Sequence, residues 1–369
     1  MSDIKAPWME PVFLQDIGTS NHYGYQHNGN IIVCSKEELI EKINTPSLNI
    51  IYIVTPNFSH IQILHEVDEF ADASHQQMRA QAKDELKSNL INGAIISFII
   101  YQHMRALFYV VIAMYMIPIL KNCWCIILKK PDKQWRINQS KNIRFRNWIA
   151  PRKNGKWKII GILIILSGIQ QIIFGLNPSI GIGGLLKENV RNGEYWRILT
   201  CTFLHGNIIH FIFNMMALAS LSAILEKIYR FESLIITYVL ACIAGSLASC
   251  FFSPFANSVG ASGGILGLLG FLLGCSIKFR NFIPKDFFWA FLNPAMYIII
   301  MGFAAKDVID NAAHAGGFFM GFFLAFILQN HEEFVENQIS NVKKTISASC
   351  LLLLVTSFII LTYKIVLIK

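Results

Sequence analysis

Four polar side chains lie in apolar stretches of the sequence and are candidates for joint chemistry: Ser262, His314, His210 and Asn214. A serine hydroxyl becomes a useful nucleophile when an adjacent base such as imidazole accepts its proton. Neutral amide or imidazole N–H groups and backbone N–H groups can stabilise the oxyanion that follows attack on a carbonyl carbon. These residue types therefore indicate hydrolysis by a serine nucleophile, which requires no metal and no cofactor.

Two helix faces without side chains could bring the hydroxyl and the imidazole together. Glycines recur at positions 263, 267, 270 and 274, and His314, Gly317 and Gly321 follow an i, i+3, i+7 spacing. Each set falls on one face of a helix, and small-residue faces allow membrane helices to approach closely. We expect the two faces to pack together, with the backbone N–H of Ser262 at a helix N-terminus as a further oxyanion donor.

The composition predicts an integral membrane protein. Of 369 residues, 54% are hydrophobic and only 15% are charged, and several apolar runs approach 20 residues. We expect an all-α polytopic protein with seven spans near 157–176, 205–225, 234–252, 262–277, 287–304, 311–328 and 346–366. The fourth would be only about 24 Å long against a hydrocarbon core of ~30 Å, so the loop before it should dip into a water-filled cavity.

Charge sets the expected topology. Residues 1–89 carry 6 Lys/Arg against 12 Asp/Glu, and much of the positive surplus lies between Lys129 and Lys158, just before the first span. The positive-inside rule explains this surplus and places the N-terminus in the cytoplasm, whereas nothing indicates a nucleic-acid partner. His210, Asn214, Ser262 and His314 then share the outer leaflet, where polar groups are costly and functional by default.

The sequence of the N-terminal third does not indicate a catalytic or binding site. Residues 1–89 indicate a small polar α/β domain, with a β-α-β fragment, a Ser35/Glu38 capping box and a helix from about residue 60 to 87. Residues 90–156 form an apolar or interfacial helical segment and a basic linker, and 90–128 fits a buried or interfacial hairpin as well as a true span. The first residues lack the pattern of a cleaved signal peptide.

Other catalytic patterns fail. GASGG at 260–264 matches a nucleophile elbow, but no strand of a soluble sheet precedes it. His331-Glu332 begins a zinc motif whose second histidine is replaced by Val335, and His205 and His210 are five residues apart. The cysteines indicate neither a disulfide framework nor a zinc site, so we predict no metal site.

Five segments in order carry a resemblance to a known family: EYWR (194–197), FLHGNIIHFIFNMMAL (203–218), GSLAS (245–249), VGASGGILGLLG (259–270) and AHAGGFFMG (313–321). Together they resemble the rhomboid family of intramembrane serine proteases across about residues 155–330. The resemblance implies a six-helix core over 157–330 and a linker with a seventh transmembrane helix over 331–369, in a six-plus-one arrangement.

The resemblance also implies roles. Ser262 would be the nucleophile and His314 the general base and acid of a dyad without a carboxylate, with His210, Asn214 and the Ser262 amide forming the oxyanion hole. The positions implied to be structural are His205, Trp196, Arg197, Gly260, Gly263, Gly267, Gly317 and Gly321. One position departs from the family, because Leu266 stands where an aromatic residue often stacks on the catalytic histidine.

The expected function is cleavage of transmembrane proteins, in or beside their spans, near the outer face of a bacterial cell membrane. Substrates would have helices that unwind easily and a small residue at the cut. Two alternatives remain. One is a non-catalytic relative that binds transmembrane clients, which typically lacks the serine or the histidine. The other is a transporter, which would string ionisable residues across the whole membrane.

Overall fold

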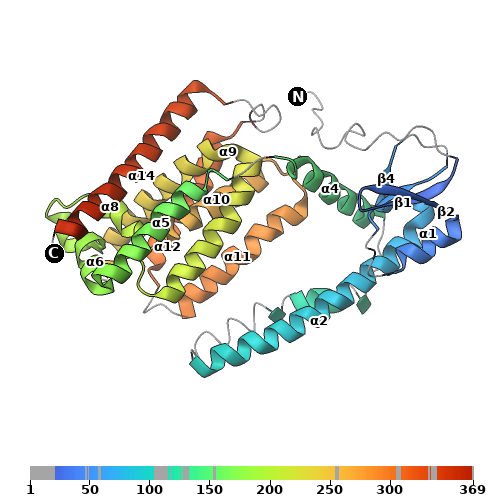
Figure 1. Cartoon of the computed structure of the whole chain (residues 1–369), viewed down its shortest axis with the longest axis horizontal. Helices are drawn as coiled ribbons and strands as arrows, with labels where there is room; N and C mark the ends of the chain where they lie inside the picture. The colour runs from blue at the N-terminus through green and yellow to red at the C-terminus, as the bar shows by residue number, and fades with distance from the viewer. Residues whose placement is uncertain are drawn as a thin grey trace. The chain divides into compact units, whose positions relative to one another are not determined.

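The computed structural model describes residues 21–45, 48, 50–56, 60–103, 115–116, 118–124, 126–127, 133–152, 155–253, 257–304, 309–330, 333 and 339–367. The chain divides into two compact units, one formed by Met1–Trp148 with Phe303–Ala305, the other by Ile149–Gly302 with Lys306–Lys369. Figure 1 shows the sheet and α2 of the first unit and the helical bundle of the second. Each is described by itself.

The N-terminal unit contains a four-stranded antiparallel sheet. Its strands are β1 (Tyr23–His27), β2 (Asn30–Cys34), β3 (Tyr52–Val54) and β4 (Gln62–Ile63), in the order β2-β1-β3-β4. Helix α1 (Lys36–Ile43) begins with the expected capping box, in which Ser35 and Glu38 exchange hydrogen bonds. The expected β-α-β fragment was incomplete, because β1 and β4 add antiparallel partners that the sequence did not indicate.

The long helix of this unit, α2, spans Ala71–His103. The prediction of a helix from about residue 60 to 87 was wrong at both ends. Residues 62–63 pair with β3, and two 3-10 turns (Leu64–Glu66 and Asp68–Phe70) precede the helix. A strand pairing is a nonlocal contact, which helical periodicity cannot show.

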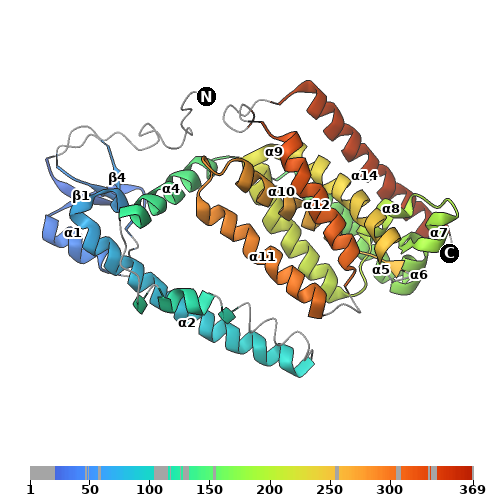
Figure 2. The ribbon, with the colours of Figure 1, turned by 180° about the vertical axis from the view of Figure 1, so that it is seen from behind.

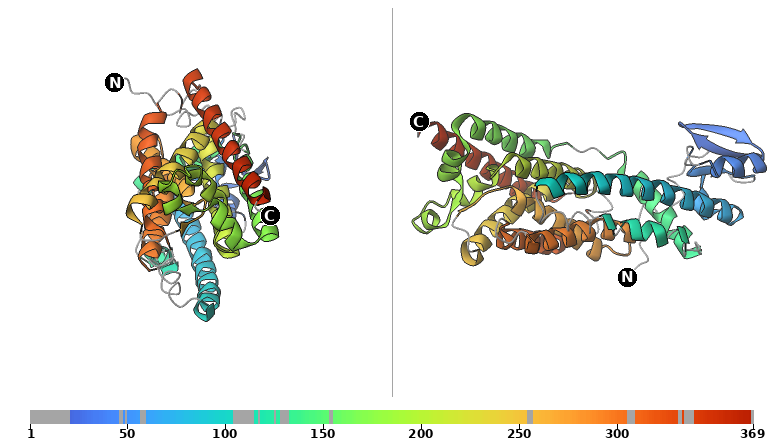
Figure 3. Two further views of the ribbon diagram at one scale, coloured as in Figure 1. Left: turned by 90° about the vertical axis from the view of Figure 1, so that its left-hand side faces the viewer. Right: turned by 90° about the horizontal axis from the view of Figure 1, so that it is seen from below.

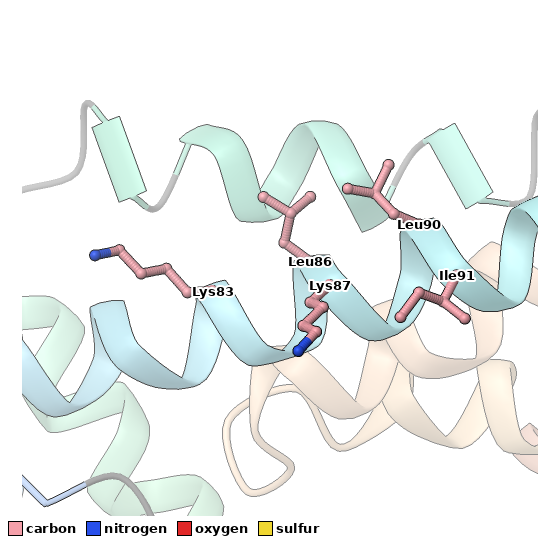
Figure 4. A pocket seen from close by; sticks show the side chains of 5 residues that line it. All are labelled: Lys83, Leu86, Lys87, Leu90 and Ile91. Carbon is pink, nitrogen blue, oxygen red and sulfur yellow. The ribbon is translucent and has the colours of Figure 1, made fainter.

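The apolar segment after residue 90 is helical where the structure describes it. In α2, Gly93 packs against the ring of Tyr115, so two parts of this segment are in contact. Residues 104–114, which belong to the expected hairpin or span over 90–128, lie outside the described part of the chain. Figure 4 shows a shallow pocket on α2 lined by Lys83, Leu86, Lys87, Leu90 and Ile91.

The basic stretch expected as a linker contains helix α4 (Lys133–Ile149). Arg136 pairs with Asp68, at 2.5 Å between Nη2 and Oδ1, and Arg144 pairs with Glu66 at 2.8 Å. The Arg136 hydrogen bond holds the pKa of the Asp68 carboxyl below its ordinary value. Part of the basic surplus therefore forms ion pairs within the N-terminal unit.

His65 makes the stability of the N-terminal unit depend on pH. Its Nδ1 lies 2.5 Å from Oγ of Ser74, and its ring packs edge-on against Trp135. Burial, and secondarily the charge of Arg136, lower the pKa of His65 from its ordinary 6.5 to about 4. The unfolded chain therefore binds more protons between these values, so stability is present above pH 6.5 and falls as the pH drops toward 4.

We expect chemical unfolding of the full chain, followed by tryptophan fluorescence, to show this loss. His65→Gln removes the titrating group and should flatten that part of the curve. Equal slopes in wild type and His65→Gln would contradict the assignment.

The second unit is a helical bundle. Its elements are α5 (Lys158–Phe174), α6 (Leu176–Gly183), β5 (Leu185–Leu186), α7 (Lys187–Arg191), α8 (Arg197–Thr200), α9 (Ile208–Phe252), β6 (Asn257–Ser258), α10 (Ser262–Lys278), α11 (Lys285–Ala304), α12 (Asn311–Leu328) and α14 (Asn341–Leu367). Helix α10 is the central one: residues 263–276 are all buried, and α9 and α12 pack against it and against each other (Figure 2).

The second and third expected spans are two helices that meet at Arg230 (φ 68°, ψ 166°, non-helical) and together carry the label α9. A short break thus replaces the expected loop at 226–233. Just before it, the Glu226 carboxylate accepts hydrogen bonds from the backbone N–H groups of Gly155, Lys156 and Trp157, at 2.9 to 3.2 Å. Glu226 thereby anchors the chain where α5 begins.

The helices support a membrane protein. Among the described residues, α9, α12 and α14 are long and apolar enough to cross a bilayer, and α5 and α10 are shorter apolar helices. Helix α10 has 17 residues, in agreement with the expected short fourth span. The protein is an all-α polytopic membrane protein with a small N-terminal sheet.

The last helix, α14, packs against α9 and against the segment that contains α6 and α8, as Figures 1 and 3 show. Gln170 of α5 donates to Oγ1 of Thr362 at 2.9 Å, and Phe358 packs edge-on against Phe203. A Cβ at Gly183 would overlap Leu361. Helix α14 is therefore an integral part of this bundle.

Candidate active site

Ser262 and His314 meet at the ends of two different helices. Nε2 of His314 lies 2.9 Å from Oγ of Ser262, a hydrogen-bond distance. Ser262 is the first residue of α10, and His314 is in the first turn of α12. Among the described residues no group bonds Nδ1 of His314, which is buried. The geometry suits proton transfer from hydroxyl to imidazole.

The two glycine faces are in direct backbone contact. A Cβ at Gly317 would overlap the carbonyl oxygen of Gly263, and one at Gly321 would overlap that of Gly267. One at Gly274 would come 2.7 Å from the carbonyl oxygen of Phe322. Only glycine permits this approach of α10 and α12, because any side chain would fill the space between the backbones. The small-residue spacing therefore sets the distance between Ser262 and His314.

His210 and Gly260 lie beside the serine. A Cβ at Gly260 would lie 2.8 Å from Cε1 of His210 and 3.7 Å from Oγ of Ser262. Gly260 also has φ +133°, a region that favours glycine. The structure thus explains on steric grounds why glycine occupies position 260, which the sequence pattern alone did not reveal.

Asn214 is buried one helical turn after His210 on α9. Its Nδ2 donates to the carbonyl oxygen of His210 at 3.1 Å, which uses one of its two amide hydrogens. The other hydrogen remains available as a donor. Asn207, the N-cap of α9, accepts from the backbone N–H of His210 at 2.8 Å and fixes the start of this helix.

His205 lies before α9, in contrast to the expectation that it belongs to the second span. His205 is buried, and the side chain of Gln171 makes two hydrogen bonds with its backbone. The His205 N–H donates to Oε1 of Gln171 at 2.9 Å, and Nε2 of Gln171 donates to the carbonyl oxygen of His205 at 3.1 Å. Its ring packs edge-on against those of His210 and Phe211. These contacts suit a packing role that joins α5 to the start of α9.

Arg197 organises the loop before α9. Its guanidinium donates to Oε2 of Glu194 at 2.5 Å and to the carbonyl oxygens of Gly181 and Gly184 at 3.1 and 2.9 Å. The hydrogen bond from Arg197 holds the pKa of Glu194 below its ordinary value. Trp196 places its ring 4.1 Å from Nζ of Lys364, a cation–π contact with α14.

The same loop contacts the segment that leads to Ser262. Strand β5 pairs with β6, with Leu185 opposite Ser258, and the N–H of Gly260 donates to the carbonyl oxygen of Cys201 at 3.0 Å. Ala261 is fully buried. Backbone hydrogen bonds therefore hold the residues just before the serine.

Sequence reasoning missed three residues at this site: Gln171, Asn207 and Asp310. Asn207 and Asp310 directly precede apolar helices, and the N-cap preference of Asn and Asp was a usable signal for both. Gln171 had no local signal, because its partner is 34 residues away. Leu266, the position that departs from the family, is buried. Among the described residues, no group of three or more His, Cys, Asp or Glu side chains could hold a metal ion.

The fold and this geometry define a class, namely helical membrane proteins with a serine–histidine pair at the ends of two closely packed helices. Residues 192–331 match the family model described as the Rhomboid domain, and this range contains His210, Asn214, Ser262 and His314. This part of the chain is therefore a Rhomboid domain by its match to the family model.

Curated relatives agree with this assignment. The chain is 37% identical to RHOMBOID-like protein 5 of Arabidopsis thaliana over 161 residues, which is 42% of this chain and 52% of the relative. It is 34% identical to RHOMBOID-like protein 7 of the same plant over 189 residues, 47% of this chain and 59% of the relative. It is 37% identical to the rhomboid protease GluP of Bacillus subtilis over 186 residues, which is 48% of this chain and 36% of the relative. The chain thus spans between 36% and 59% of the length of these relatives.

Proposed function

We propose that this protein is an intramembrane serine endopeptidase that cleaves other membrane proteins in or beside their transmembrane segments. The observation that carries the proposal is the 2.9 Å contact between Nε2 of His314 and Oγ of Ser262. The rhomboid domain and the similarity to a rhomboid protease support it.

In the proposed reaction, Oγ of Ser262 attacks the carbonyl carbon of the scissile bond while Nε2 of His314 accepts the hydroxyl proton. The carbonyl oxygen becomes an oxyanion. Its donors would be the Ser262 backbone N–H, unpaired within the helix because it is in the first turn of α10, together with Asn214 and His210.

Collapse of the tetrahedral intermediate breaks the C–N bond, and His314 returns the proton to the leaving amine. A water molecule, deprotonated by His314, then attacks the acyl ester and releases the second product. This cycle requires that His314 be neutral before each attack, so cleavage should decline in acid as the imidazole protonates.

We further propose the following placement for this protein. It lies in a bacterial cell membrane with its N-terminal domain (1–89) in the cytoplasm and its site open to the extracytoplasmic side. The protease core is 157–330, with a seventh helix following in 331–369. Its partners are transmembrane substrates and the bilayer, with no nucleic acid.

The alternative is a non-catalytic rhomboid-like protein that only binds transmembrane clients. Reaction with a fluorophosphonate separates the two, because this probe modifies serines that a neighbouring base activates. We expect the full-length protein in detergent to be labelled at Ser262, identified by peptide mass spectrometry, and to cut a model membrane substrate in vesicles. Absence of labelling, together with equal substrate cleavage by wild type and Ser262→Ala, would reject the protease proposal.

A further inference from the structure

Asp310 caps the helix that carries His314. Its Oδ1 accepts a hydrogen bond from the backbone N–H of Ala313 at 3.1 Å, and its carbonyl oxygen accepts from the backbone N–H of His314, also at 3.1 Å. An aspartate at this position satisfies a backbone donor that the first helical turn leaves unpaired. Asp310 thus holds the backbone of the first turn of α12 directly.

The second oxygen of this carboxylate joins two other elements. Oδ2 of Asp310 accepts from Oγ of Ser258 at 2.8 Å and also from Oγ of Ser249. Ser249 is fully buried on α9, and Ser258 lies in β6, four residues before Ser262. One carboxylate therefore connects α9, the segment leading to the serine and the helix that bears the histidine.

Lys187 supports the same junction. Its Nζ donates to the carbonyl oxygen of Ser253, the C-cap of α9, at 2.8 Å. Its side chain is largely buried and interacts favourably with the charge of Asp310. Hydrogen bonds to an ionised acceptor are stronger than those between neutral groups. A charged Asp310 therefore strengthens its hydrogen bonds with Ser249 and Ser258.

We propose that Asp310 is a positioning residue of the hydrolytic site, which fixes α12 against α9 and β6 so that Nε2 of His314 stays within reach of Oγ of Ser262. This inference rests on the proposed function. Asp310 positions the helix through its hydrogen bonds, which among the described residues go to the backbone N–H groups of Ala313 and His314 and to the two serines; none goes to the imidazole. It is not a third member of the dyad.

The test uses the rate of fluorophosphonate labelling of Ser262 in the full-length protein, measured against probe concentration to separate the maximal rate from the half-saturating concentration. We expect Asp310→Ala to lower the maximal rate roughly 10- to 100-fold, the loss typical of a misplacement near 1 Å, with the half-saturating concentration unchanged. Asp310→Asn keeps an acceptor for Ala313, and the serine hydroxyls can rotate to accept from its amide. It should therefore restore most of the rate.

A second variant separates positioning from helix capping. The double change Ser249→Ala with Ser258→Ala leaves the bond between Asp310 and Ala313 intact but removes the connections to α9 and β6. We expect it to slow labelling in the same direction as Asp310→Ala. Ser357→Ala is the matched control and should label at the wild-type rate, because among the described residues Ser357 of α14 bonds only the carbonyl oxygen of Leu353 in its own helix.

The outcomes differ for the two proposals. If wild type is not labelled and cuts the model substrate no better than Ser262→Ala, the protease proposal fails and this inference fails with it. If wild type reacts and the maximal rate is unchanged in Asp310→Ala or in the double serine variant, the protease proposal stands and the positioning role is overturned. A variant that melts at a lower temperature but labels at the wild-type rate below that temperature would identify Asp310 as a helix cap only.

Discussion

Ser262→Ala and His314→Ala should each lower the rate of substrate cleavage by roughly three orders of magnitude or more, and the double variant should lose no more than either single one. In the proposed mechanism the two side chains form one proton-transfer unit, and in the structure a 2.9 Å contact joins them. Without the hydroxyl there is no nucleophile. Without the imidazole the hydroxyl keeps its proton and attacks poorly.

The measurement is the initial rate of cleavage of a model transmembrane substrate in vesicles, with equal amounts of folded enzyme. Ser276→Ala is a matched control, because Ser276 is another serine of α10, is buried, and among the described residues donates only to the carbonyl oxygen of Leu272, at 2.7 Å. It should cut at the wild-type rate. Losses that multiply in the double variant would show that the two residues act independently and would contradict the dyad.

Asn214→Ala gives a graded comparison within this prediction. Removal of one oxyanion donor costs about 10²- to 10³-fold in rate, so this variant should retain measurable cleavage. In the structure the Asn214 amide donates one hydrogen to the carbonyl oxygen of His210, so only its other hydrogen can be donated to an oxyanion. A loss equal to that of Ser262→Ala would place Asn214 in the proton transfer and change the proposed mechanism.

Helix periodicity carried enough information to predict how the dyad comes together. The spacing of Gly263 and Gly267 on one helix, and of Gly317 and Gly321 on another, indicated two smooth faces, and the structure places their backbones in contact. This prediction needed only the 3.6-residue repeat and the apolar surroundings. The partner helix could be chosen because its histidine, His314, shares a face with Gly317 and Gly321.

The contacts that stabilise this arrangement could not be predicted in the same way. Asp310 bonds Ser249 and Ser258, which are 61 and 52 residues away, and no repeat in the sequence links these positions. The prediction of the N-terminal sheet was incomplete for a similar reason. Strand β4 has two residues, Gln62 and Ile63, and only its pairing with β3 distinguishes it from the start of a helix. Nonlocal hydrogen bonds decide both cases, whereas propensity describes only the local chain.

Gly317→Ala and Gly321→Ala should both destabilise the helical bundle, by about 1–3 kcal/mol or more each, because the added methyl group overlaps a backbone carbonyl that has no room to move. At Gly321 the obstacle is the carbonyl oxygen of Gly267, and at Gly317 it is that of Gly263. A flexible side chain could rotate away from a new methyl group. A helix backbone can yield only by moving the whole helix.

The two variants should differ in activity. Gly317 is one turn after His314 and faces the residue next to Ser262, so separation of the helices there should lengthen the dyad contact directly. Gly321 is a further turn away, where a tilt of α12 can absorb part of the strain. We therefore expect Gly317→Ala to lose most of the fluorophosphonate labelling rate, and Gly321→Ala to lose stability with a smaller loss of labelling.

Thermal unfolding in detergent and the labelling rate below the melting temperature measure these two effects separately. Gly181→Ala is the matched control, because Gly181 is a helical glycine of the same bundle whose added Cβ would meet no atom within 4 Å. Its melting temperature should equal that of wild type or exceed it, since alanine restricts the unfolded chain. If Gly317→Ala melted and labelled like Gly181→Ala, the distance between α10 and α12 would not depend on the glycine faces. The physical basis proposed for the dyad would then be wrong.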